Sequence, residues 1–79
     1  IDLKKINTLE IFKWLKNCKI SDKEMLKTFN CGVGFCLIVD QRKIGSIKKY
    51  FPNGYKPYII GKISNGKDKV KLNGSIKWI

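Results

Sequence analysis

The chain has 79 residues, of which 43% are hydrophobic, and a formal net charge of +11 without any histidine. This length allows one small domain, which buries only about 60% of the surface that its unfolded form exposes. The composition excludes a collagen, a disulfide-rich scaffold and a disordered chain, and no apolar run is long enough to predict a membrane span. Because histidine is absent, catalytic units that depend on it, such as Ser-His-Asp, are excluded as well.

The charge and the cysteines both favour a chain with a solvated surface and reduced thiols over a nucleic-acid or metal protein. Nearly all cations are lysines scattered along the chain, and Arg42 is the single arginine. Base recognition favours the bidentate fork of arginine, so we interpret the lysines as a solvated surface and expect no nucleic-acid partner. Cys18, Cys31 and Cys36 form no CxxC pair and predict no metal site. We interpret them as reduced thiols of a cytosolic protein, with Cys36 as a small core residue.

In chain order, residues 1–7 predict a connector, and Thr8 is the expected N-cap of a first helix that ends near Asn17. The spacing of the apolar residues in this helix predicts one buried face. Five residues would form that face: Leu9, Ile11, Phe12, Trp14 and Leu15.

A second helix is predicted after Ser21, which forms a capping box with Glu24. Met25, Leu26 and Phe29 are expected to point inward from it. The glycines of residues 30–34 then predict a tight loop. Residues 33–39 are apolar throughout, which is typical of a central strand covered on both faces.

The remaining pattern predicts one more helix and three strands. Asp40 is the expected N-cap of a helix over residues 41–50, and a turn follows at residues 52–54. Strands are predicted at 58–64, 69–72 and 75–78, with Asn65-Gly66 starting a hairpin turn that includes Asp68. The order of these elements predicts an α+β fold or an α/β sandwich, with a sheet that is too small to be complete.

The loop from Thr28 to Gly34 is the strongest candidate for a functional site. Glycines one residue apart allow successive N–H groups to point into one concavity, which suits a phosphate. Asn30 adds an amide and Thr28 adds a hydroxyl. The alternative is a plain helix-to-strand turn in which Gly32 has a positive φ and Gly34 lets a neighbour pack closely. The residues alone leave both interpretations open.

Three segments resemble motifs of one enzyme family, the aminoimidazole ribonucleotide synthetases (phosphoribosylformylglycinamidine cyclo-ligases). Residues 24–34 (EMLKTFNCGVG) resemble the family's EM-x-x-TFN-x-G-x-G segment. Residues 11–15 (IFKWL) are similar to its x-F-x-W-L helix, and residues 58–63 (YIIGKI) resemble its Y-x-I-G-x-I strand. The motifs occur in order at the family's spacing over residues 9–72, which makes the resemblance specific.

This resemblance implies that residues 1–79 form a single partial domain, the second half of the family's C-terminal domain. The implied fold is α+β with α/β/α layers, in which helices flank a small mixed sheet. The family converts formylglycinamidine ribonucleotide to aminoimidazole ribonucleotide in purine biosynthesis, using ATP and Mg2+. Both cofactors would be bound mainly by an N-terminal domain that is absent here, so the fragment alone would be inactive. The implied partners are the small-molecule substrate and the remainder of its own chain, in a cytoplasmic homodimer without a membrane association.

The resemblance also implies that Thr28, Asn30, Gly32 and Gly34 bind substrate, as one wall of the substrate cleft. It assigns no catalytic residue and no metal ligand to this chain. Two alternatives stay open: a small basic RNA-binding module, and another ATP-using member of the same superfamily. If the chain is a fragment, exposed apolar surface is expected, with Trp14, Phe35 and Trp78 as candidates.

Overall fold

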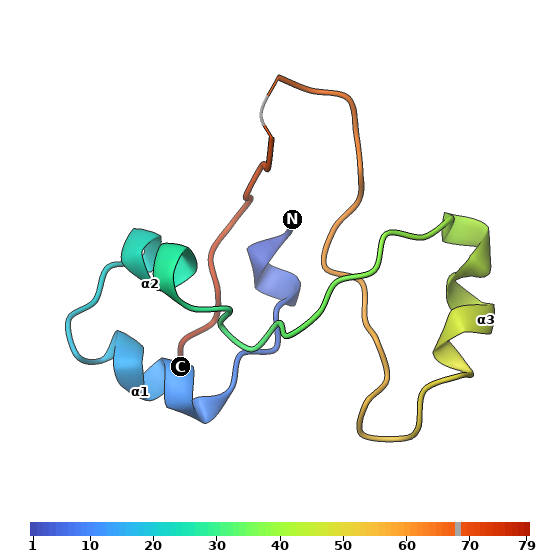
Figure 1. Ribbon diagram of the computed structural model, residues 1–79. Coiled ribbons are helices and arrows are strands. Elements are labelled where there is room, and N and C mark those ends of the chain that lie inside the picture. Colours follow the sequence, from blue (N-terminus) through green and yellow to red (C-terminus); the bar gives the residue numbers. More distant parts are fainter. Residues whose placement is uncertain (68) are drawn as a thin grey trace.

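The computed structural model describes residues 1–67 and 69–79 (Figure 1). Within them it has three α-helices, α1 (Glu10–Lys16), α2 (Asp22–Thr28) and α3 (Ile44–Lys48), and two short 3-10 helices, Leu3–Lys5 and Gln41–Lys43. Helices α1 and α2 lie together on one side of the molecule, and α3 lies on the other, with extended chain between them (Figure 1). The predicted hairpin turn at Asp68 lies outside the described residues.

The capping box predicted for α2 is confirmed at its serine. The Glu24 N–H donates to Ser21 Oγ over 3.2 Å, which satisfies one of the N-terminal donors of the helix. Met25 lies on the inner face of α2, and its side chain is fully buried. Leu26 and Phe29 pack against the same core, as predicted.

Helix α1 starts later than the sequence predicts, and Thr8 is not its cap. The N-cap is Leu9, without a side-chain hydrogen bond, and the Leu9 carbonyl accepts from Phe12 N–H at 3.0 Å. The Thr8 hydroxyl is buried and has no partner among the described residues. Thr8 is held instead by packing, because the backbone at Gly32 approaches its Cα closely. The Phe12 ring packs against Phe29 of the next segment, with centroids 6.1 Å apart.

The core is small and joins both ends of the chain to α2. Its buried members are Leu3, Ile6, Met25, Cys31 and Ile76. Partly buried hydrophobic residues complete it, among them Phe12, Leu15, Ile20, Leu26, Phe29, Val33, Ile60 and Trp78. Trp78 was expected to be exposed, and this prediction is wrong because its ring packs on the core. Trp14 is exposed, as expected for a fragment, but its predicted place on the buried face of the first helix is wrong. Leu9 and Ile11 are exposed as well, so only Phe12 and Leu15 turn that face toward the core.

The first three residues lie between two segments from the C-terminal part of the chain. The Asp2 N–H donates to the Ile60 carbonyl over 2.7 Å, and the Leu3 N–H donates to the Asn73 carbonyl over 2.9 Å. The Asn73 N–H returns a bond to the Ile1 carbonyl at 3.0 Å, which forms a parallel bridge between Asp2 and Asn73. The residues predicted as a connector therefore hold together the centre of the fold.

The predicted mixed sheet is not formed within the described residues. Segments 33–39, 58–64, 69–72 and 75–78 are irregular, and the Asp2–Asn73 bridge is the only strand pairing described. A strand exists only where its N–H and C=O groups pair with a neighbour. An apolar pattern cannot supply that neighbour. The prediction that residues 33–39 are covered on both faces is wrong, since Phe35 is 84% exposed. Cys36 is likewise exposed and is not a core residue.

The third helical region begins at Asp40 as predicted but is shorter. The Arg42 N–H donates to Asp40 Oδ1 over 2.8 Å, and the Arg42 guanidinium donates to Oδ2 over 2.8 Å. The guanidinium and this backbone bond lower the pKa of the Asp40 carboxyl. Helix α3 ends at Lys48, whose carbonyl accepts from Lys56 Nζ at 3.0 Å. The predicted turn at residues 52–54 is confirmed by a Tyr55 N–H to Pro52 carbonyl bond of 3.1 Å.

Candidate functional site

The candidate loop starts where α2 ends. Thr28 is the last helical residue, and Phe29 is the C-cap with extended backbone angles, φ −120° and ψ 154°. The Phe29 N–H still donates to the Met25 carbonyl over 2.9 Å, so the last turn of the helix is closed. The Phe29 side chain packs on the core. The loop after Phe29 therefore starts from a fixed position at the end of α2.

Asn30 closes a tight turn with its own side chain and backbone. Its Oδ1 accepts from the Gly32 N–H over 2.8 Å, and its carbonyl accepts from the Val33 N–H over 3.0 Å. The two residues between Asn30 and Val33 have positive φ, +54° at Cys31 and +103° at Gly32. Positive φ at both central positions matches a type I′ turn, and glycine at the second of them is typical. Asn30 precedes these positions, and its side chain closes an Asx turn onto the Gly32 N–H.

The buried side chain of Cys31 anchors the turn to the core. A non-glycine residue with positive φ costs about 1–3 kcal/mol, and it persists only where the surroundings hold it. The Cys31 side chain is 1% exposed, and its Sγ lies 3.6 Å from the carbonyl oxygen of Met25. Burial raises the pKa of the Cys31 thiol. The loop is therefore fixed to the core by a thiol that takes no part in its exposed face.

The thiols should differ in reactivity for this reason. Because a thiolate is the reactive form, the raised pKa and burial of Cys31 are expected to slow its alkylation at least tenfold relative to Cys18 and Cys36. Mass spectrometry of the native chain after brief iodoacetamide treatment should show two modified cysteines, and three only after denaturation. Equal labelling of all three thiols in the native chain would contradict the anchored turn.

The two glycines of the loop serve different purposes. A Cβ at Gly32 would lie 3.1 Å from the Asn7 carbonyl oxygen and 3.3 Å from Thr8 Cα, so the loop packs on the segment before α1. Both this contact and the positive φ require glycine, as the plain-turn interpretation predicts for Gly32. A Cβ at Gly34 would meet nothing within 4 Å, and its φ is not positive. Close packing therefore does not explain Gly34.

The turn leaves only part of its polar groups for a ligand. The N–H groups of Gly32 and Val33 donate to Asn30 itself, so they are not aimed at an anion. Within the described residues, the Asn30 side-chain NH2 group, the Thr28 hydroxyl and the Gly34 N–H make no hydrogen bond. Thr28, Asn30 and Gly34 are all exposed. A ligand at this loop would be bound through these three groups.

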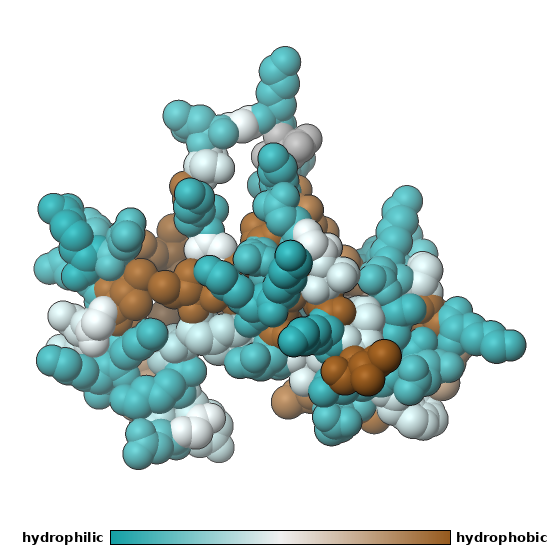
Figure 2. All heavy atoms as spheres, turned by 180° about the vertical axis from the view of Figure 1, so that it is seen from behind, coloured by the Kyte–Doolittle hydropathy of each residue, from teal (hydrophilic) through white to brown (hydrophobic). Residues whose placement is uncertain are grey.

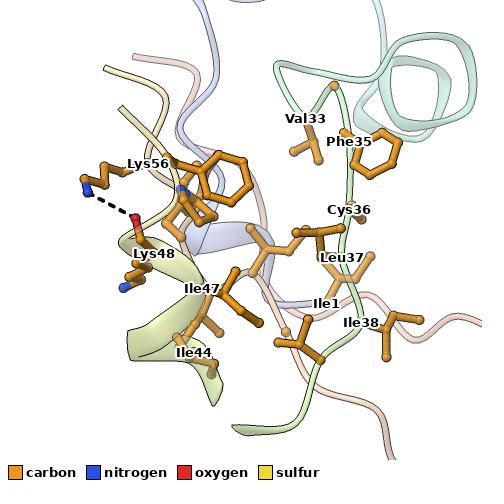
Figure 3. A pocket seen from close by; sticks show the side chains of 18 of the residues that line it. Ile1, Val33, Phe35, Cys36, Leu37, Ile38, Ile44, Ile47, Lys48 and Lys56 are labelled. Atoms are coloured by element: carbon orange, nitrogen blue, oxygen red, sulfur yellow. Dashed lines mark hydrogen bonds between the residues drawn. The ribbon is translucent and has the colours of Figure 1, made fainter. Parts of the chain in front are cut away.

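A cavity of about 820 Å3 adjoins the loop on its far side from α2. Gly32 and Gly34 line it, whereas Thr28 and Asn30 do not. Figure 3 shows Leu37 and Ile1 opposite Ile44 and Ile47 of α3 across this space. The structure therefore brings the two glycines to the cavity and leaves the other two predicted residues at the outer surface. This cavity was not predicted from the sequence. The apolar run at 33–39, together with Ile44 and Ile47 three residues apart, could have indicated it, because these residues form its walls.

Neither a metal-binding group nor a membrane helix is found in the part of the chain that the structure describes. No three side chains among Cys, Asp and Glu gather closely enough there to hold a metal ion. Of the helices within residues 1–67 and 69–79, none is long and apolar enough to cross a membrane.

Comparison with known proteins places the loop in a family context. Residues 1–73 match the family described as AIR synthase related protein, C-terminal domain. The chain belongs to this family. The segment from α2 through the Asn30 turn lies within this matched range. None of the solved structures gives a significant match to the chain.

The relatives of this chain have the names of purine-biosynthesis enzymes. It is 44% identical over 71 residues to a phosphoribosylformylglycinamidine cyclo-ligase of Methanococcus maripaludis strain C5, covering 87% of this chain and 20% of that protein. The cyclo-ligase of Thermodesulfovibrio yellowstonii is 43% identical over 65 residues, covering 78% of this chain and 19% of its own length. A bifunctional purine biosynthetic protein purD of Dictyostelium discoideum is 44% identical over 69 residues, 85% of this chain and 8% of that protein. The chain spans about a fifth of the length of the cyclo-ligases it matches.

Proposed function

We propose that this chain is the C-terminal part of an ATP-dependent phosphoribosylformylglycinamidine cyclo-ligase, which forms aminoimidazole ribonucleotide from formylglycinamidine ribonucleotide. The observation that carries the proposal is the Asn30 turn. It is built from residues 28–34 of the segment that resembles the family's EM-x-x-TFN-x-G-x-G motif. At the end of α2 it presents three polar groups that have no partner among the described residues. Relatives at 43–44% identity bear the cyclo-ligase name. We propose a cytoplasmic enzyme, homodimeric at full length, whose substrate is this small molecule.

ATP and Mg2+ would be bound elsewhere in such an enzyme. The described residues of this chain hold no cluster of carboxylates that fits a divalent cation. The two cofactors are therefore assigned to the part of the cyclo-ligase length that this chain lacks, and this chain alone is expected to be inactive. ATP supplies the phosphoryl group that activates the formyl oxygen of the substrate. No step of that transfer is assigned to a residue of this chain.

The contribution of the chain would be positioning. Thr28, Asn30 and Gly34 offer a hydroxyl, an amide NH2 group and a backbone N–H, all donors suited to phosphate or ribose oxygens. Gly32 has a supporting part, because it allows the turn that presents Asn30. Holding the substrate by its ribose phosphate lowers the entropic cost of bringing the reacting groups together. A side chain at Gly34 would obstruct close approach of a ligand to the backbone, which explains glycine at a position where packing does not require it.

The activity is tested by ADP release from a protein that joins this chain to the preceding four-fifths of the Methanococcus maripaludis strain C5 cyclo-ligase. Release is expected only when formylglycinamidine ribonucleotide and Mg2+ are both present. The 79-residue chain alone should release none. A folded fusion protein that forms no aminoimidazole ribonucleotide would overturn the proposed function.

Asn30 provides the sharpest test of the substrate site. In the active fusion protein, Asn30→Ala and Asn30→Asp are each expected to raise the KM for the ribonucleotide at least tenfold, since both remove the NH2 donors. Aspartate keeps the oxygen that accepts from the Gly32 N–H, so it preserves the turn. If Asn30→Asp has unchanged kinetics, the residue only shapes the loop, and the substrate assignment is wrong.

The RNA-binding alternative has no comparable support. Such modules stack bases on aromatic residues of adjacent paired strands. Phe35 is exposed, but it lies on a segment that pairs with no strand among the described residues. The relatives also do not point to nucleic acid, because their names refer to purine biosynthesis. We therefore do not propose it.

A further inference from the structure

The cavity beside the candidate loop is an open apolar groove. Its walls are residues 33–39, the inner side of α3, and residues 55–63. Large apolar side chains along it remain in water, with Phe35 84%, Ile38 80% and Ile63 75% exposed. Seen from behind, apolar surface is visible between projecting hydrophilic side chains (Figure 2). Contiguous apolar surface of this kind marks a surface that another polypeptide covers.

The backbone along one wall of the groove is ready to pair with a strand. Within the described residues, none of the backbone N–H or C=O groups of residues 34–39 makes a hydrogen bond. This row follows directly after the Asn30 turn, which fixes its start. An extended chain added alongside would satisfy these groups and cover the apolar side chains at the same time.

The charges at the groove indicate what the added chain must carry. Lys48, Lys56 and Lys62 line it, and no acidic side chain among the described residues does so. Figure 3 shows Lys48 and Lys56 at one side of the space, joined by the hydrogen bond to the Lys48 carbonyl. A second copy of this chain is a poor occupant, because each copy carries a net charge of +11. An acidic segment suits the groove better.

We propose that this groove binds an extended segment with alternating apolar and acidic residues, which pairs with residues 34–39 and belongs to the part of the cyclo-ligase length that this chain lacks. This proposal rests on the proposed function. The chain corresponds to the C-terminal part of proteins about five times as long, so most of such an enzyme lies outside it. Covering the groove would join the substrate loop to that larger part, because Gly32 and Gly34 belong to both.

Binding between separate pieces tests the proposal. The 79-residue chain is titrated with the preceding four-fifths of the Methanococcus maripaludis strain C5 cyclo-ligase, purified as a separate polypeptide, and complex formation is followed by fluorescence anisotropy. A 1:1 complex is expected, with a Kd that rises at least tenfold between 50 mM and 500 mM salt. Equal binding at both salt concentrations, or none at either, would overturn the charge complementarity.

Proline substitutions test the strand pairing. Successive N–H groups of an extended chain point to opposite sides, so one of Leu37→Pro and Ile38→Pro must remove a donor that pairs with the added strand. That variant should bind at least tenfold more weakly. Both variants should keep the circular dichroism of the parent, because this segment makes no hydrogen bond in the described structure. If both bind like the parent, the strand pairing is wrong.

Charge-reversal variants test whether binding depends on the lysines that line the groove or only on the net positive charge of the chain. Lys48→Glu and Lys62→Glu are each expected to weaken binding at least fivefold. Lys23→Glu, an exposed position on α2 outside the groove, makes the same change in charge and should leave the Kd within twofold. Equal weakening by all three would overturn the groove as the site, and a tight dimer of the 79-residue chain would show a second copy to be its occupant.

These outcomes are independent of the catalytic test. If the pieces bind through the groove and the fusion protein forms no product, the proposed function fails while the docking surface stands. If the fusion protein is active and the proline and lysine variants bind normally, only the docking surface fails.

Discussion

Replacing Met25 with alanine is expected to lower the free energy of unfolding by about 2–5 kcal/mol, the usual cost of truncating a fully buried aliphatic side chain. Met25 is 0% exposed and lies at the centre of the small core. Its carbonyl oxygen also receives the Phe29 N–H and lies next to Cys31 Sγ, so a cavity there would loosen the substrate turn. A core of this size supplies only about 3–5 kcal/mol, so the variant should be largely unfolded at 25 °C.

Urea denaturation followed by circular dichroism measures this effect. Met25→Leu is the matched control, because it nearly conserves volume and should cost less than about 1.5 kcal/mol. A midpoint for Met25→Ala within the error of the parent would show that α2 is not seated on the core as described.

Gly61→Ala should be the second most damaging substitution, at about 1–3 kcal/mol. The added Cβ would lie 2.9 Å from Ile1 Cα and 3.3 Å from the Ile1 nitrogen, which are backbone atoms that no rotamer change can move away. Relief requires the first residues to shift, and the hydrogen bond between Asp2 N–H and the Ile60 carbonyl lies directly beside them. The glycine of the YIIGKI segment is thus explained by close approach of two chain segments.

Gly45→Ala is the control for this prediction. Position 45 lies in α3, has no atom within 4 Å of an added Cβ and has no positive φ, so alanine there should stabilise the helix by about 0.5–1 kcal/mol. The two glycine substitutions are therefore expected to shift the thermal midpoint in opposite directions. A Gly61→Ala midpoint as high as that of Gly45→Ala would contradict the observed contact with Ile1.

Local chemistry made parts of this fold predictable. Ser21 with Glu24 specified the start of α2, Asp40 specified the start of the third helical region, and a proline, an asparagine and a glycine specified the turn at 52–54. Each of these signals acts within a few residues of its effect. The strands were not predictable in the same way. The run at 33–39 has the composition of a covered strand, but pairing and covering depend on other segments, which the described residues do not provide.

The candidate site was likewise predictable only where its geometry depends on nearby residues. The loop was predicted from Asn30, Gly32 and Gly34, since asparagine and glycine favour such turns through their own backbone geometry. The sequence could not reveal that the Asn30 side chain would use the Gly32 N–H, or that Gly34 would stand in open space while Gly32 packs on residues 7 and 8. The packing of Gly32, in particular, depends on a contact between segments more than twenty positions apart.

The bonds made by the first residues have a consequence for the order of folding during synthesis. The Ile1 nitrogen donates to the Lys71 carbonyl over 2.8 Å, a contact that spans 70 residues. The bonds of α1 and α2 are local, but helices of seven residues are only transient until they pack. The positive φ of Cys31 in the Asn30 turn likewise needs the core around it. Leu3 must wait for Ile76 before the core that they share can close. Nearly the whole chain must therefore be made before its core closes, and until then its apolar segments are open to aggregation.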